Sequence, residues 1–176
     1  MPMIDACIPK DALTPVAEQR LLDELTEILL AIEGFEPSSP LARDATWIFV
    51  QRPDVFVAGA RPARPSYRFI VSVPEGQFEE ASRELVVSEV TAAVARAEGV
   101  RVDEVSKRVW VFPLEIQDGS WGARGEIQRL PDILAHLAGE DVRWVGERRL
   151  ADIRRRRSVA LLNLIREGSG VKNLIK

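Results

Sequence analysis

The fold is decided by two stretches of the sequence, LLDELTEILLAI at residues 21–32 and VVSEVTAAVARA at residues 86–97. In each stretch the apolar residues recur every three or four positions, which is the spacing that places them on one face of a helix. The apolar positions of the second stretch repeat those of the first at a constant offset of 65 residues, as in Leu21 and Val86, Leu25 and Val90, or Leu29 and Val94. We therefore predict two helices that are copies of one another.

The residues at the helix ends support the same repeat. Thr14 followed by Pro15 predicts the start of the first helix, because a threonine side chain can cap a helix and proline fits its first turn. Gly34 and Gly99 are again 65 residues apart, and each suits the C-terminal turn of its helix.

Strand-like runs flank both predicted helices. Residues 3–8 and 46–51 enclose the first helix, and residues 67–73 and 109–114 enclose the second. The result is two tandem βαβ units, in which each crossover pairs its two strands in parallel. The predicted fold class is α+β: a four-stranded sheet with two helices on one face, plus a C-terminal helical extension. The proline-containing segment 53–66 predicts an ordered surface connection between the two halves.

The second face of the predicted sheet has no helix to cover it. It carries apolar side chains, and a small sheet of this kind commonly buries such a face against other subunits. The pattern itself therefore predicts an oligomer.

The composition is that of a compact soluble protein, with 46% hydrophobic and 29% charged residues. No apolar run approaches the roughly 20 residues that span a bilayer, and the first ten residues lack the features of a secretory signal, so we expect a cytoplasmic protein without a membrane partner. The single cysteine, Cys7, excludes an internal disulfide, and with one histidine, His136, no Cys/His zinc cluster can form. We expect neither a metal nor a cofactor.

The C-terminal part of the chain is basic. Residues 142–176 carry 10 Lys and Arg against 3 acids, whereas residues 1–141 carry 14 against 24. We predict a short helix at 131–137, a longer one at 146–166 on which Leu150, Ile153, Leu161 and Leu164 can share one face, and a loose end at 167–176. Residues 136–176 would form a basic helical extension packed on the domain of residues 1–135. Without interleaved aromatic residues, the basic run does not predict a nucleic-acid surface.

Three features together resemble the tautomerase superfamily, in the form that fuses two βαβ units in one chain. They are Pro2 directly after the initiator methionine, the tandem βαβ repeat, and the segment EIQDGSWGARGE at residues 115–126. That segment looks like the glycine-rich segments of malonate semialdehyde decarboxylases and oxalocrotonate tautomerases. The resemblance covers roughly residues 1–135.

The resemblance implies a cofactor-free enzyme, a homotrimer, and a substrate that is a small carbonyl acid. Pro2 would be the acid or base through its free amine once the methionine is removed. The decarboxylase pattern also suggests Asp44 as a second catalytic residue, and Arg61, Arg64 and Arg68 as ligands of a substrate carboxylate. Trp121 would form a wall of the pocket and exclude water.

The oxalocrotonate pattern fits less well, because Trp110 stands where that subfamily carries an arginine on the second strand of a unit. A dicarboxylate tautomerase of that type is therefore disfavoured. Tautomerisation, hydration and decarboxylation all remain open. The alternative is a non-catalytic or diverged βαβ oligomer that keeps the tautomerase scaffold.

Overall fold

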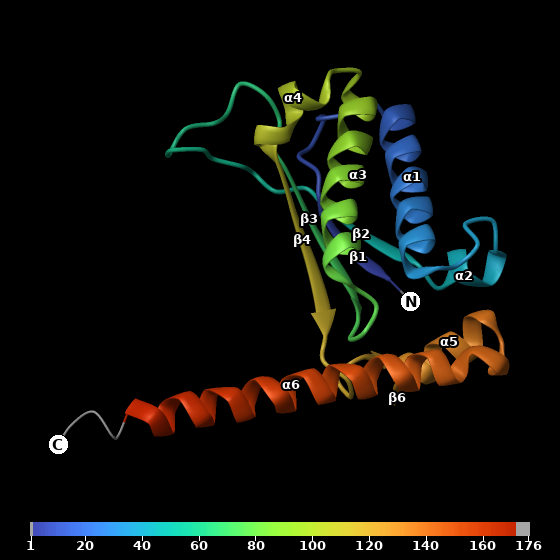
Figure 1. The fold of residues 1–176 in the computed structure, drawn as a ribbon. Helices are drawn as coiled ribbons and strands as arrows, with labels where there is room; N and C mark the ends of the chain where they lie inside the picture. The colour runs from blue at the N-terminus through green and yellow to red at the C-terminus, as the bar shows by residue number, and fades with distance from the viewer. Residues whose placement is uncertain (1, 172–176) are drawn as a thin grey trace.

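The computed structural model describes the chain from residue 2 to residue 171 and contains the predicted four-stranded sheet (Figure 1). Its strands are β1 (Met3–Cys7), β2 (Trp47–Gln51), β3 (Tyr67–Pro74) and β4 (Val109–Ile116), arranged in the order β2-β1-β3-β4. β1 pairs with β2, and β3 with β4, in parallel, whereas the two units meet through an antiparallel β1–β3 pair. The two predicted βαβ crossovers are thus confirmed.

Two long helices cover one face of this sheet. They are α1 (Pro15–Glu33) and α3 (Glu80–Glu98), and their bounds differ by the 65 residues of the sequence repeat. As predicted, the Thr14 hydroxyl accepts a hydrogen bond from the Ala17 amide (3.2 Å), and Gly34 ends α1 with a left-handed φ of 84°. Alternate strand residues such as Ile4, Phe69 and Val71 fill the core beneath the two helices.

The other face of the sheet is open, as expected, and largely apolar. The register aligns its residues in rows across the strands: one row contains Trp47 and Leu114 at its two ends, and the next contains Phe49 and Phe112. These side chains, together with Trp110, are exposed in the protomer. Asp5 and Arg68 are the charged residues among the strand positions that point to this face.

Shorter elements connect the main ones. α2 (Pro40–Asp44) precedes β2, and α4 (Val102–Val105) with a 3-10 turn at Ser106–Arg108 precedes β4. The segment 53–66 forms an irregular surface loop in which Arg61 pairs with Asp54 (2.9 Å). After β4, a small hairpin of β5 (Gly122–Ala123) and β6 (Glu126–Ile127) leads to the C-terminal helices.

The C-terminal extension consists of α5 (Leu130–Ala138), a 3-10 turn at Glu140–Val142 and the long helix α6 (Arg143–Val171). Leu130, Ile133, Leu134 and Leu150 form a second apolar cluster with Leu30 and Phe35 at the end of α1. α6 begins at Arg143, earlier than the predicted start at residue 146. It also ends later than predicted, because the helix continues through residues 167–171, where we expected a loose end. Residues 172–176 of that predicted loose end lie outside the described part of the chain.

A partly buried ion pair joins the end of α3 to the start of β4. Arg108 donates two hydrogen bonds to the Glu98 carboxylate, at 2.9 and 2.7 Å. Burial alone would raise the pKa of Glu98, but the hydrogen bonds from Arg108 lower it below its usual range. Burial and the neighbouring Glu98 raise the pKa of Tyr67. No helix within residues 2–171 is long and apolar enough to cross a membrane.

Candidate active site

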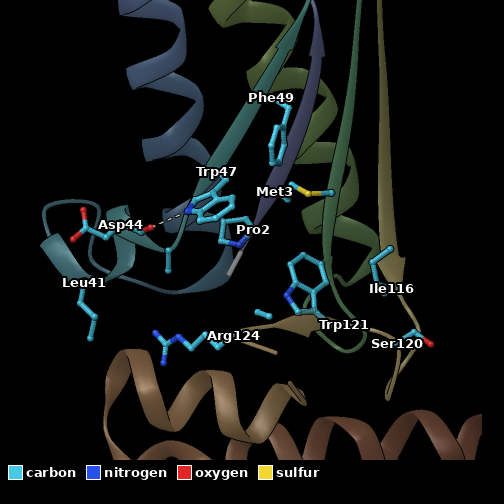
Figure 2. A pocket seen from close by; sticks show the side chains of 13 residues that line it. Pro2, Met3, Leu41, Asp44, Trp47, Phe49, Ile116, Ser120, Trp121 and Arg124 are labelled. Carbon is cyan, nitrogen blue, oxygen red and sulfur yellow. Dashed lines mark hydrogen bonds between the residues drawn. The ribbon is translucent and has the colours of Figure 1, made fainter. Parts of the chain in front are cut away.

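Pro2 lies at the start of β1 and is buried. Its carbonyl oxygen accepts a hydrogen bond from the Trp47 amide (3.3 Å), which extends the β1–β2 pairing to Pro2 and fixes its place at the end of the sheet. Beside it opens a pocket of about 810 Å³ (Figure 2). The pocket is lined by Pro2, Met3, Leu41, Asp44, Ala45, Trp47, Phe49, Ile116, Ser120, Trp121, Gly122, Ala123 and Arg124.

Trp121, which we expected to form a wall of the pocket, is among the residues that line it. The β5–β6 hairpin holds it, since the Trp121 carbonyl oxygen accepts a hydrogen bond from the Gln128 amide (2.8 Å). The indole is partly buried against the second apolar cluster and faces Pro2 across the pocket (Figure 2). With Met3 and Trp47 it makes the surroundings of Pro2 mostly apolar.

Asp44 also lines the pocket, but through its backbone. Its carbonyl oxygen accepts a hydrogen bond from the Trp47 Nε1 (3.1 Å), whereas its carboxylate points away from Pro2 (Figure 2). In this arrangement Asp44 orients the Trp47 ring. The catalytic role suggested for its carboxylate stays a prediction that this side-chain orientation does not favour.

The three arginines of the predicted carboxylate site do not line the Pro2 pocket of their own protomer. Arg61 pairs with Asp54, and Arg64 lies 3.7 Å from Glu104. Arg68 pairs in register with Cys7, at the opposite end of β1 from Pro2, and its Nη2 lies 3.2 Å from the Cys7 Sγ. There it lines a second cavity of about 430 Å³ with Lys107 and Trp110.

Arg124, which was not among the residues predicted from the sequence, is the arginine that lines the pocket. Its Nη2 lies 2.6 Å from the His136 Nε2 on α5. Because a guanidinium can only donate hydrogen bonds, the Nε2 is the acceptor in this contact. Arg124 adopts a left-handed φ of 57° between Ala123 and Gly125. Arg124 belongs to the segment 115–126 that carries the family resemblance. Its place in that segment, three residues after Trp121, could have indicated that it lies at the same pocket.

A second missed residue is Glu33, a buried carboxyl at the end of α1. Burial raises the pKa of Glu33, and Gln77 and Arg149 act against that rise. Arg149 of α6 donates to the Gln77 Oε1 (2.6 Å), so this polar cluster ties α6 to both βαβ units. The repeat could have indicated it, because Glu33 and Glu98 are 65 residues apart.

Within residues 2–171, no cluster of three or more His, Cys, Asp or Glu side chains is arranged to hold a metal ion. The pocket offers the backbone nitrogen of Pro2, the Arg124 guanidinium and the Ser120 hydroxyl, within mostly apolar walls.

Comparison with known proteins found no matching family model and no matching curated protein. Solved structures do match. One is a wild-type fused 4-OT described as an asymmetric trimer, 15% identical over 71% of this chain and 94% of that chain, with a TM-score of 0.58. Another is Pt0534 inactivated by 2-oxo-3-pentynoate, 16% identical over 72% and 94%, with a TM-score of 0.58. A third is macrophage migration inhibitory factor of Toxoplasma gondii, 12% identical over 72% and 99%, with a TM-score of 0.56. These likenesses confirm the predicted fold.

Proposed function

From a chain with the fold of the tautomerase superfamily, we propose a cofactor-free enzyme that uses the amine of Pro2 as acid or base on a small carbonyl acid. The amine becomes free when Met1 is removed. The observation that carries this proposal is the position of Pro2, which is buried beside a mostly apolar pocket of about 810 Å³.

A prolyl amine in such a pocket suits proton transfer. An α-amino group has a pKa of about 8 in model peptides, and apolar surroundings disfavour its charged form and lower that pKa. The neutral amine can take a proton from the carbon next to a carbonyl group, while the C–H electron pair moves into the enolate and its charge onto oxygen. Return of the proton to oxygen or to another carbon completes a tautomerisation with no net change in atoms.

Arg124 is the group that we assign to the substrate carboxylate. A guanidinium binds a carboxylate through charge-assisted hydrogen bonds, and Arg124 is the cationic residue among those that line the pocket. His136 accepts one Nη2 hydrogen bond and thereby orients the guanidinium. Arg61, Arg64 and Arg68 could reach a substrate only in a pocket formed with another copy of the chain.

The proposal predicts covalent labelling of Pro2 by 2-oxo-3-pentynoate, the compound that inactivated Pt0534. A neutral amine should add to C4 of this oxo acid, the methyl-bearing alkyne carbon that is conjugated with the carbonyl group, and the proton that the amine loses is taken up at C3. The whole reagent is then retained. We expect one reagent mass per chain, located on the peptide that begins with Pro2, together with loss of turnover of phenylpyruvate.

Cys7 is the competing nucleophile, because thiols also add to such reagents. It lies within β1 and is buried, so the Cys7→Ala variant should be labelled as fast as the wild type. Labelling confined to Cys7, or a native chain that retains Met1, would contradict the proposal and favour the non-catalytic scaffold.

Substitution of Arg124 tests the substrate class. We expect Arg124→Ala to lower kcat/KM for an oxo acid about tenfold, which is the effect of losing one hydrogen bond to a charged group, and to leave the methyl ester unaffected. Arg101→Ala is the matched control, since Arg101 is an exposed arginine paired with Asp103 and was not predicted to bind substrate. Steady-state kinetics on acid and ester measure both effects, and equal losses on the two substrates would remove Arg124 from the carboxylate site.

We also propose a homotrimer in which the open sheet faces point inward. The exposed Trp47, Phe49, Trp110, Phe112 and Leu114 on that face support this assembly, because burial between copies removes their apolar surface from water. The fused 4-OT that this fold resembles is described as a trimer.

A further inference from the structure

The long helix α6 has two halves with different surroundings. In the first half, Leu150 is buried, and Arg149 donates to the Gln77 Oε1 (2.6 Å). Further along, Arg154 lies 2.9 Å from the Asp118 carboxylate, and Arg157 pairs with Glu75. These contacts hold the first half of α6 against the end of the sheet and the turn that follows β3.

The face that makes these contacts continues into the second half. At helical spacing, Leu150 and Ile153 are followed on the same face by Leu161 and Leu164. Both leucines are largely exposed, at 59% and 65%. Figure 1 shows the reason: α6 runs past the end of β4 and out beyond the sheet, so the protomer has no surface there to cover them.

The charge of the helix indicates what could cover this face. Residues 142–176 have a surplus of 7 positive charges, and residues 1–141 have a surplus of 10 negative charges. The Arg154 and Arg157 pairs show that the helix already binds carboxylates of its own body. Between them, Arg155 and Arg156 form no ion pair with any residue in the described part of the chain. The acidic body of a second copy offers the same kind of carboxylate surface.

We propose that the second half of α6 is a strap that docks on a neighbouring copy of this chain, with Leu161 and Leu164 as its apolar contacts. The strap rests on the proposed homotrimer, in which the inward-facing sheets bring neighbouring bodies next to the projecting helix. The solved structures described above match no more than 72% of this chain. The strap thus adds an intersubunit contact to the one made by the open sheet faces.

The test compares two sets of substitutions on opposite faces of α6. In the double variant Leu161→Asp and Leu164→Asp, the proposed contact is removed. Leu162→Asp is the matched control, because Leu162 is 58% exposed but points away from that face. Light scattering over a dilution series should show a wild-type mass of three 19.6 kDa chains. We expect the double variant to dissociate at concentrations at least tenfold higher, and the control to match the wild type.

A crosslinking measurement keeps the test independent of variant folding. A photoreactive benzophenone side chain at position 164 should give covalent dimers of the chain, and the same group at position 162 should not. A wild-type trimer with equal dissociation of the double variant and the control, or crosslinks from position 164 only within one chain, would overturn the strap alone. A monomeric wild type would overturn the trimer and the strap together. Labelling of Pro2 reports on the chemistry separately from both.

Discussion

Replacement of Pro2 by alanine is expected to lower kcat/KM for phenylpyruvate on the order of 100-fold, within the range in which a positioned acid or base contributes to catalysis. Alanine at position 2 still permits removal of Met1, so the variant keeps an amine. That amine is primary and free to rotate, whereas the ring of Pro2 holds the nitrogen in one orientation beside Trp121. The fall in kcat/KM therefore measures how much the fixed orientation of the secondary amine contributes to catalysis.

A matched control is Pro9→Ala, which changes a proline beyond the other end of β1. It should leave kcat/KM within about twofold of wild type, because general stability effects away from the reacting groups change neither the amine nor the pocket. Mass spectrometry of each chain establishes that it begins at position 2. Equal activity of wild type and Pro2→Ala would refute the acid–base role of Pro2.

The second large effect concerns folding. Arg108→Ala is expected to lower the free energy of unfolding by about 3 kcal/mol, because it leaves the partly buried Glu98 carboxylate without its cation. The two side chains are 15% and 11% exposed and share two hydrogen bonds. Urea unfolding measures the change. Arg101→Ala is the control, since Arg101 is 81% exposed and its pair with Asp103 should contribute less than about 1 kcal/mol.

The same ion pair predicts a pH dependence. The pKa of Glu98 is lowered in the folded chain from an ordinary value of 4.5, so the folded state holds this proton less tightly than the unfolded state. The stabilisation by the pair is present above about pH 4.5 and is lost as the pH falls through the folded pKa. The difference in unfolding free energy between wild type and Arg108→Ala should therefore shrink on acidification. A constant difference from pH 7 to pH 3 would contradict this account.

The sequence by itself determined the two βαβ units. Helical spacing in residues 21–32 and 86–97 fixes which side chains face the sheet, and Thr14 and Gly34 fix where α1 begins and ends. These are local effects, since periodicity and capping depend on neighbours within a turn or two of the chain. The parallel pairing within each unit follows from the crossover helix. The place of Pro2 and Trp121 in one pocket followed from the family resemblance.

The tertiary structure alone decided which charged groups share that pocket. Arg61, Arg64 and Arg68 precede or begin β3, but the antiparallel β1–β3 register carries Arg68 to Cys7, at the far end of β1 from Pro2. Arg124 lies at the pocket because its own backbone adopts a left-handed conformation in the turn between β5 and β6. Its guanidinium also contacts the His136 imidazole of α5. The direction of the Asp44 carboxylate and the overhang of α6 are likewise set by packing between segments distant in sequence. Such contacts carry no periodic signal, because they depend on where loops and helix ends meet in space.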